Sequence, residues 1–120
     1  MGFPQAIAAG FGNYVNFSGR AARPEYWYFV LFLVIVGIIT AIIDLTVFGA
    51  EQIGPTNAIF SLATILPSLA VTIRRLHDIG RTGWWVLLSF VPLVGIIILI
   101  IWWCRQGEAG PNAYGPPPAV

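Results

Sequence analysis

The sequence has few charged residues, and it contains no lysine. Charged residues make up 9% of its 120 residues, against about 25% in an average soluble domain. Six arginines and five acidic residues give a net charge of +1, so the chain lacks the dense basic face of a nucleic-acid-binding protein. The single cysteine, Cys104, excludes an internal disulfide framework. With only one histidine besides, the usual ligand set of a zinc site is missing, and we expect no metal or other cofactor.

Apolar residues are abundant instead, at 58% of the chain, and they form three long stretches. The stretches cover about residues 27–48, 57–73 and 84–104. The first and third correspond to helices of roughly 33 and 31 Å, which would cross a hydrocarbon core of ~30 Å. The second, at roughly 25 Å, is short unless it continues into Arg74–Leu76. Because backbone groups in lipid must bond one another, the sequence predicts an all-α polytopic membrane protein with three transmembrane helices.

The two ends of the chain carry weaker signals. The segment from Phe3 to Phe11 is apolar but too short to span, so we expect a short interfacial helix or a loose leader. Residues 107–120 are rich in glycine and proline, which predicts an extended tail. Residues 1–118 then form a single membrane domain, since no linker divides them.

The arginines predict the orientation. Arg20 and Arg23 precede the first stretch, and Arg74, Arg75 and Arg81 lie between the second and third. The connection between the first two stretches has no arginine and carries Glu51. The positive-inside rule therefore predicts a cytoplasmic N-terminus and, with three spans, a C-terminus outside. The alternative is a third stretch that folds back near Pro92 and Gly95, which would return the C-terminus to the cytoplasm.

Tryptophans at the expected edges agree with these spans, because rings with one polar atom prefer the headgroup layer. We expect the following as interfacial anchors, the last two at the far end of the third span: Trp27, Trp84, Trp85, Trp102 and Trp103.

Two arginine-bearing motifs could carry chemistry. The first contains Arg20, Arg23 and Glu25 just before the first stretch. It either forms the start of the first helix, with its arginines anchored among lipid headgroups, or binds a ligand. The second runs Arg74-Arg75-Leu76-His77-Asp78-Ile79-Gly80-Arg81. Arg74 and Asp78 stand one helical turn apart and can pair if the second stretch continues as a helix, whereas His77 and Asp78 point about 100° apart and form no ready dyad. This motif is either a topology-setting loop that pairs with Glu25 or Asp78, or a cradle for a phosphate or lipid headgroup.

Two residues inside the apolar stretches stand out. Asp44 either reaches the interface or serves as an intramembrane relay for protons or ions. Pro67 removes the helical hydrogen bond to the carbonyl of Ala63 and predicts a kink.

The motifs resemble those of the domain-of-unknown-function 805 family of small bacterial inner-membrane proteins. The likeness covers roughly Tyr14 to Pro118 and is most specific at Arg74–Asp78, Gly80-Arg81 and Gly83-Trp84-Trp85. The tail pattern around Asn112 and Tyr114 agrees with it, whereas Thr82 and Pro117 depart from it. The resemblance implies a multi-pass membrane protein and supplies no activity, substrate or cofactor.

We therefore expect an integral protein of the bacterial inner membrane that is not an enzyme and acts as an interaction or accessory protein. Its expected partners are anionic phospholipid and either further copies of itself or a larger membrane protein, because three short helices bury little surface. The alternatives are a small transporter or channel subunit, with Asp44 in its path, and an enzyme acting on lipid or phosphate through His77 and Asp78.

Overall fold

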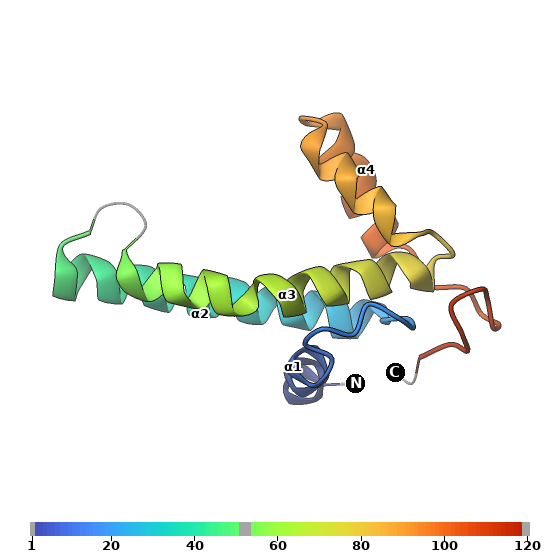
Figure 1. Ribbon diagram of the computed structural model, residues 1–120, viewed down its shortest axis with the longest axis horizontal. Helices are drawn as coiled ribbons and strands as arrows, with labels where there is room; N and C mark the ends of the chain where they lie inside the picture. Colours follow the sequence, from blue (N-terminus) through green and yellow to red (C-terminus); the bar gives the residue numbers. More distant parts are fainter. Residues whose placement is uncertain (1, 51–53, 119–120) are drawn as a thin grey trace.

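The computed structural model of the protein describes residues 2–50 and 54–118, and every regular element within them is a helix. The all-α prediction is therefore confirmed for this part of the chain. Glu51 and residues 119–120 of the predicted tail lie outside it. In chain order the elements are α1 (Phe3–Gly12), α2 (Arg23–Phe48), α3 (Pro55–Asp78), the 3-10 helix η1 (Gly83–Phe90) and α4 (Val94–Cys104) (Figure 1).

Helices α2 and α3 form an antiparallel pair along the long axis of the molecule (Figure 1). They have 26 and 24 residues, and both are long and apolar enough to cross a membrane. Their outward faces are apolar, since Ile38, Ile42 and Leu62 are 56%, 56% and 71% exposed. A surface of this kind suits lipid rather than water.

Both long helices extend beyond the predicted stretches at the arginine-bearing end. Helix α2 begins at Arg23 rather than at Trp27, with Pro24 and Glu25 in its first turn. Helix α3 runs from Pro55 through Asp78. The second stretch is therefore long enough without bilayer thinning, because the last turn with its arginines remains helical.

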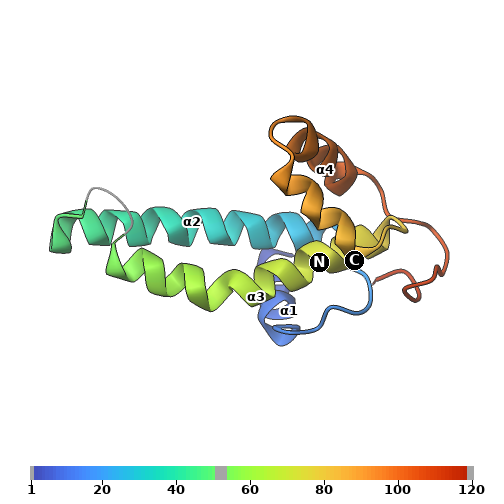
Figure 2. The ribbon, with the colours of Figure 1, turned by 45° about the horizontal axis from the view of Figure 1, so that its top comes forward.

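The prediction of one continuous helix over residues 84–104 is wrong. The chain forms η1, reverses at Val91–Leu93, and returns as α4 beside η1 (Figure 2). Pro92 offers no backbone N–H, and Leu93 has φ 62°, a conformation that interrupts a helix. The absence of a side chain at Gly95 lets α4 approach η1, because a Cβ there would collide with the Leu88 carbonyl oxygen.

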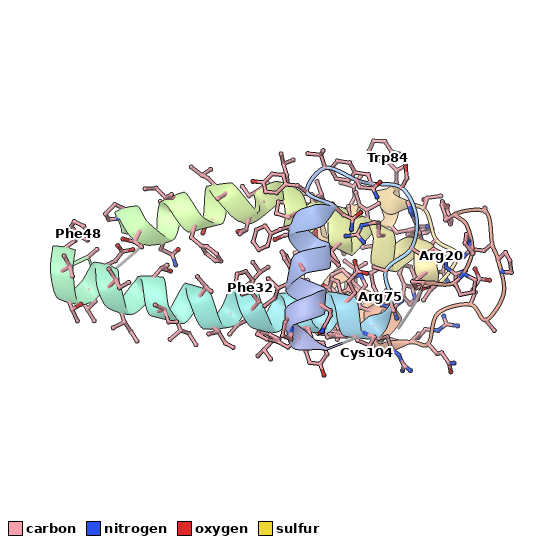
Figure 3. All side chains as sticks on the ribbon, turned by 90° about the horizontal axis from the view of Figure 1, so that it is seen from below. Arg20, Phe32, Phe48, Arg75, Trp84 and Cys104 are labelled. Carbon is pink, nitrogen blue, oxygen red and sulfur yellow. The ribbon has the colours of Figure 1, made fainter. Side chains whose placement is uncertain are left out.

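This reversal returns Cys104 to the end of the molecule where η1 begins, opposite Phe48 (Figure 3). Trp102 and Trp103 were expected at the far end of a third span, and this placement is also wrong. The rings of Trp85 and Trp102 meet edge to face with centroids 5.5 Å apart. The alternative expectation, a segment that folds back near Pro92 and Gly95, matches the course of the chain.

Helix α1 lies across α2 and α3 instead of along them (Figures 1 and 3). Phe11 contacts Phe29 and Phe32 edge to face, with ring centroids 5.6 and 5.7 Å apart. A Cβ on Gly10 would overlap the Phe29 ring, so the glycine permits this close crossing. The N-terminal segment is thus an ordered helix with a crosswise axis, as an interfacial helix requires.

The tail from Gly107 to Pro118 has no helix and folds over the C-terminal end of α3 (Figure 1). The backbone N–H of Glu108 donates to the Asp78 carbonyl at 2.8 Å, and Asn112 and Gly115 form an isolated bridge. The tail therefore closes the end of the molecule at which α2 begins and α3 and α4 end.

Candidate functional site

All six arginines gather at this one end, which we call the arginine end. It holds three carboxylates as well, those of Glu25, Asp78 and Glu108, so its formal charge is six minus three, or +3. The two arginine-bearing motifs meet here, and the fold-back of α4 adds Arg105 to them. The sixth arginine therefore joins the others instead of lying on the far side.

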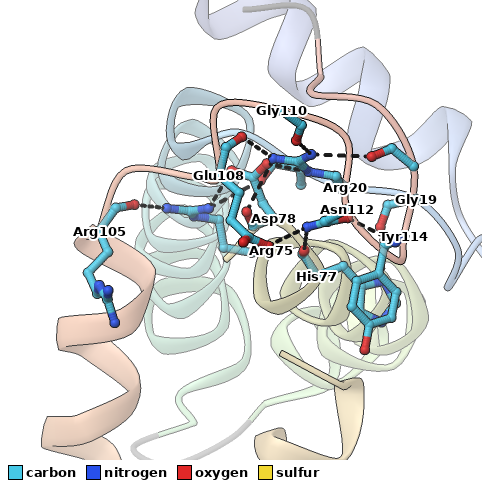
Figure 4. A network of polar contacts seen from close by, with 12 residues as sticks. Gly19, Arg20, Arg75, His77, Asp78, Arg105, Glu108, Gly110, Asn112 and Tyr114 are labelled. Atoms are coloured by element: carbon cyan, nitrogen blue, oxygen red, sulfur yellow. Dashed lines mark hydrogen bonds and ion pairs between the residues drawn. The ribbon is translucent and has the colours of Figure 1, made fainter. Parts of the chain in front are cut away.

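The carboxylate of Asp78 lies at the centre of the arginine end (Figure 4). Arg20 Nε donates to Oδ1 at 2.9 Å, and Arg75 Nη1 donates to Oδ2 at 2.8 Å. The three side chains are at most 4% exposed. A carboxylate shared by two buried guanidinium groups joins the loop before α2 to the last turn of α3. Of the two carboxylates that Arg74 could pair with, Asp78 is not its partner, because Arg74 points toward Glu25 of α2.

Arg20 has a hydrogen-bond acceptor for each of its five N–H groups. Besides Asp78 Oδ1, these are the backbone carbonyls of Asp78 and of three tail residues, Glu108, Gly110 and Gly115 (Figure 4). Since guanidinium has five N–H donors, no donor of Arg20 is left for an external ligand. Arg20 therefore folds the tail onto α3.

Arg75 anchors the C-terminal end of α4. Its Nε donates to the Trp103 carbonyl at 3.1 Å, and its Nη2 donates to the Arg105 carbonyl. Trp27 Nε1 also donates to the Trp103 carbonyl, at 3.2 Å, and Arg23 donates to the Cys104 carbonyl at 3.3 Å. The last carbonyls of a helix have no partner within the helix, and here side chains of α2 and α3 provide donors. These bonds hold the end of α4 at the arginine end and thereby impose the chain reversal.

Arg74 forms an ion pair with Glu25, and both side chains are buried. Its Nε and Nη2 have no hydrogen-bond partner among the described residues. This pair links the start of α2 to the last turns of α3. A structural role in this ion pair therefore accounts for the burial of Glu25.

His77 contacts both the loop before α2 and the tail. Its Nδ1 lies 2.9 Å from the Gly19 carbonyl and therefore carries the proton, since a carbonyl only accepts. Its ring stacks on Tyr114 with centroids 3.9 Å apart, and Asn112 donates to its backbone carbonyl (Figure 4). His77 and Asp78 form no hydrogen bond with each other, as their adjacent positions on a helix predict.

Three arginines form no ion pair among the described residues: Arg23, Arg81 and Arg105. Arg23 and Arg105 are exposed. The guanidinium of Arg81 is half-buried and lies over the Trp102 ring, 4.1 Å from its centroid, and near Trp85. These are the cations that an external anion can reach, whereas Arg20, Arg74 and Arg75 are used internally.

Asp44 lies at the opposite end of the α2–α3 pair and is 1% exposed. Its oxygens accept the backbone N–H groups of Thr56 and Asn57, at 3.0 and 2.9 Å. A carboxylate from α2 thus caps the N-terminus of α3, where unpaired N–H groups and the helix dipole favour an anion. This capping accounts for the burial of Asp44 without a relay of protons or ions.

Sequence reasoning missed the role of Tyr14. Its hydroxyl donates to the Ala63 carbonyl, the group that Pro67 deprives of its helical partner. The tail partners of Arg20 were also missed, because backbone carbonyls leave no signature in a sequence beyond the glycines that expose them. The tail pattern was the one available signal.

Comparison with known proteins shows which family the chain belongs to. Residues 14–116 match the family described as "Protein of unknown function (DUF805)". The chain belongs to the DUF805 family. It is 49% identical over 106 residues to the inner membrane protein YhaI of Escherichia coli K12, and the match covers 88% of each chain. It is 41% identical over 111 residues to the inner membrane protein YhaH of the same strain, covering 90% of this chain and 91% of that one.

A more distant relative, the uncharacterized protein YiiR of Escherichia coli K12, is 34% identical over 77 residues. That match covers 63% of this chain and 50% of YiiR. No solved structure matches the chain significantly. This DUF805 chain thus has bacterial inner-membrane relatives, and its α2 and α3 are consistent with transmembrane helices.

Proposed function

We propose that this DUF805 protein is a multi-pass inner-membrane protein whose arginine end faces the cytoplasm and contacts anionic phospholipid headgroups as a non-enzymatic accessory protein. The observation that carries the proposal is the gathering of all six arginines at one end. Arginine concentrates on the cytoplasmic side of membrane proteins, and the cytoplasmic leaflet attracts basic groups. The C-terminal tail is then cytoplasmic as well.

The single cysteine offers a direct test of this topology. Cys104 is exposed at the end of α4. We expect a membrane-impermeant maleimide to label it in inside-out vesicles and not in intact spheroplasts. As a matched control, Ala50→Cys in a Cys104→Ser background should show the reverse pattern, since Ala50 follows α2 at the opposite end. Labelling of Cys104 in intact spheroplasts would refute the proposed orientation.

Contact with headgroups is assigned to Arg23, Arg81 and Arg105, because these guanidinium groups lack carboxylate partners among the described residues. In reconstituted vesicles, spin-labelled phosphatidylglycerol should associate with the protein more strongly than spin-labelled phosphatidylcholine. Replacing all three arginines with glutamine should lower this preference several-fold, as should high salt, which screens exposed charges. A preference that survives both changes would contradict the assignment.

A further inference from the structure

A cavity of about 490 Å³ lies between α3 and η1 and is not used by any contact described above. One wall is a single face of α3, formed by Leu69, Ile73 and His77 at intervals of four residues. A volume of this size falls within the range of roughly 300–1,000 Å³ that is typical of ligand pockets.

The 3-10 geometry of η1 builds the other wall. Residues three apart are aligned in such a helix, and eight residues is a long run for one. Two of its three columns line the cavity, namely Gly83, Val86 and Ser89 together with Trp84, Leu87 and Phe90. The third column, which includes Trp85 and Leu88, contacts α4. One side of η1 therefore faces α4, and the other two sides face the cavity, which we call the groove.

The groove is apolar along its length and polar at one end. Trp84 and Phe90 are 79% and 81% exposed, so no described segment covers them. At the arginine end the lining includes His77 and Gly83, and Arg81 stands in the turn just before Gly83. A Cβ on Gly83 would lie 2.7 Å from Ile73 Cγ2, so η1 and α3 approach each other closely at this end.

We infer that the groove binds one acyl chain of an anionic phospholipid, with the phosphate at the arginine end. The inference rests on the proposed function, because it requires the arginine end to face an anionic leaflet. The apolar walls match an acyl chain, and the +3 charge of the arginine end matches an anionic headgroup. An extended protein segment is less suited, since its backbone polar groups would find few partners in walls that offer little beyond His77 and Ser89.

The test fills the groove with a larger side chain at an exposed position. Leu87 is 50% exposed, so Leu87→Trp should fold while occupying the space of the acyl chain. The matched control is Ile38→Trp, at an exposed position of α2 outside the groove. In vesicles with spin-labelled lipids, we expect Leu87→Trp to reduce phosphatidylglycerol association about tenfold and Ile38→Trp to leave it unchanged. Ser89→Phe is the second groove variant, and retained helicity by circular dichroism identifies the folded variants.

The outcomes separate the two proposals. A wild-type preference for phosphatidylglycerol that both groove variants retain would overturn the groove and leave the headgroup proposal intact. No preference in the wild-type protein would overturn both. A disulfide-linked dimer formed by Leu87→Cys in a Cys104→Ser background, with unchanged lipid association, would show a second copy in the groove and also refute the lipid.

Discussion

The protein contains two helical hairpins that differ in what their turns contain. The α2–α3 hairpin turns next to polar groups, since Asp44, Thr56 and Asn57 meet there and satisfy the start of α3. The η1–α4 hairpin turns through Val91, Pro92 and Leu93 without a side-chain cap. The first uses helices of full membrane length, and the second uses 8 and 11 residues. A helix start with its own polar partners suits the water interface, whereas the irregular backbone at Val91–Leu93 needs hydrogen-bond partners before it can lie in the hydrocarbon layer.

The largest expected effect lies where the two hairpins are joined. Asp78→Asn removes the charge between the buried Arg20 and Arg75, and we expect a loss of about 3–5 kcal/mol in the free energy of unfolding. The measurement is reversible unfolding in mixed detergent and dodecyl sulfate micelles, followed by circular dichroism. Glu108→Gln is the control, because the Glu108 side chain is exposed and forms no ion pair with any residue that the structure describes. Equal stability of the two variants would contradict a structural role for Asp78.

The turn of the first hairpin should be less critical. Asp44→Ala leaves two N–H groups of α3 without an acceptor, and loss of such a cap costs about 1–2 kcal/mol. Hydrogen exchange should increase at Thr56 and Asn57 while the arginine end keeps its protection. A loss in the free energy of unfolding as large as that of Asp78→Asn would contradict the distinction between a local helix cap and a carboxylate shared by two arginines.

The proline within α3 offers a double-mutant cycle. Tyr14→Phe removes the donor to the Ala63 carbonyl, and we expect a loss of about 1 kcal/mol. With Pro67→Ala, residue 67 regains an N–H that bonds this carbonyl, so the same Tyr14→Phe change should cost close to nothing. Additive effects of the two substitutions in the unfolding titration would show that Tyr14 acts elsewhere.

The smallest expected effect lies in the turn of the second hairpin. Leu93 has φ 62° and ψ −69°, which is unfavourable for leucine. Leu93→Gly should relieve this strain and stabilise the protein by about 1 kcal/mol or less, since the side chain is 75% exposed and loses few contacts. Leu88→Gly serves as the control, because glycine within the regular η1 should destabilise it. A destabilised Leu93→Gly protein would indicate that the turn has another conformation.

The contrast between the hairpins also explains what could be predicted from the sequence. Hydropathy identified α2 and α3, because each helix is a long apolar run with clear ends. Pro24 and Gly49 bound the first run, and Pro55 and Asp78 bound the second. It could not separate one span of residues 84–104 from two half-length helices, since Pro92 and Gly95 are compatible with both. The formation of two short helices depends on hydrogen bonds from the side chains of Arg75, Trp27 and Arg23 to the end of α4. Such long-range bonds to backbone carbonyls leave no periodic pattern in the sequence.

The same reasoning applies to the candidate site. The meeting of the two motifs followed from their placement on one side of the predicted spans. The sequence did not predict which arginine binds which carboxylate, because the direction of each side chain depends on the neighbouring helix. Arg74 and Arg75 are adjacent, yet one bonds Glu25 and the other Asp78.

The return of α4 has a consequence for biogenesis. In the proposed orientation, α1 and the tail stay on the side where the ribosome releases them, and among the described elements the N-terminus of α3 must be translocated. The tail can then fold over the last turn of α3 without crossing the membrane.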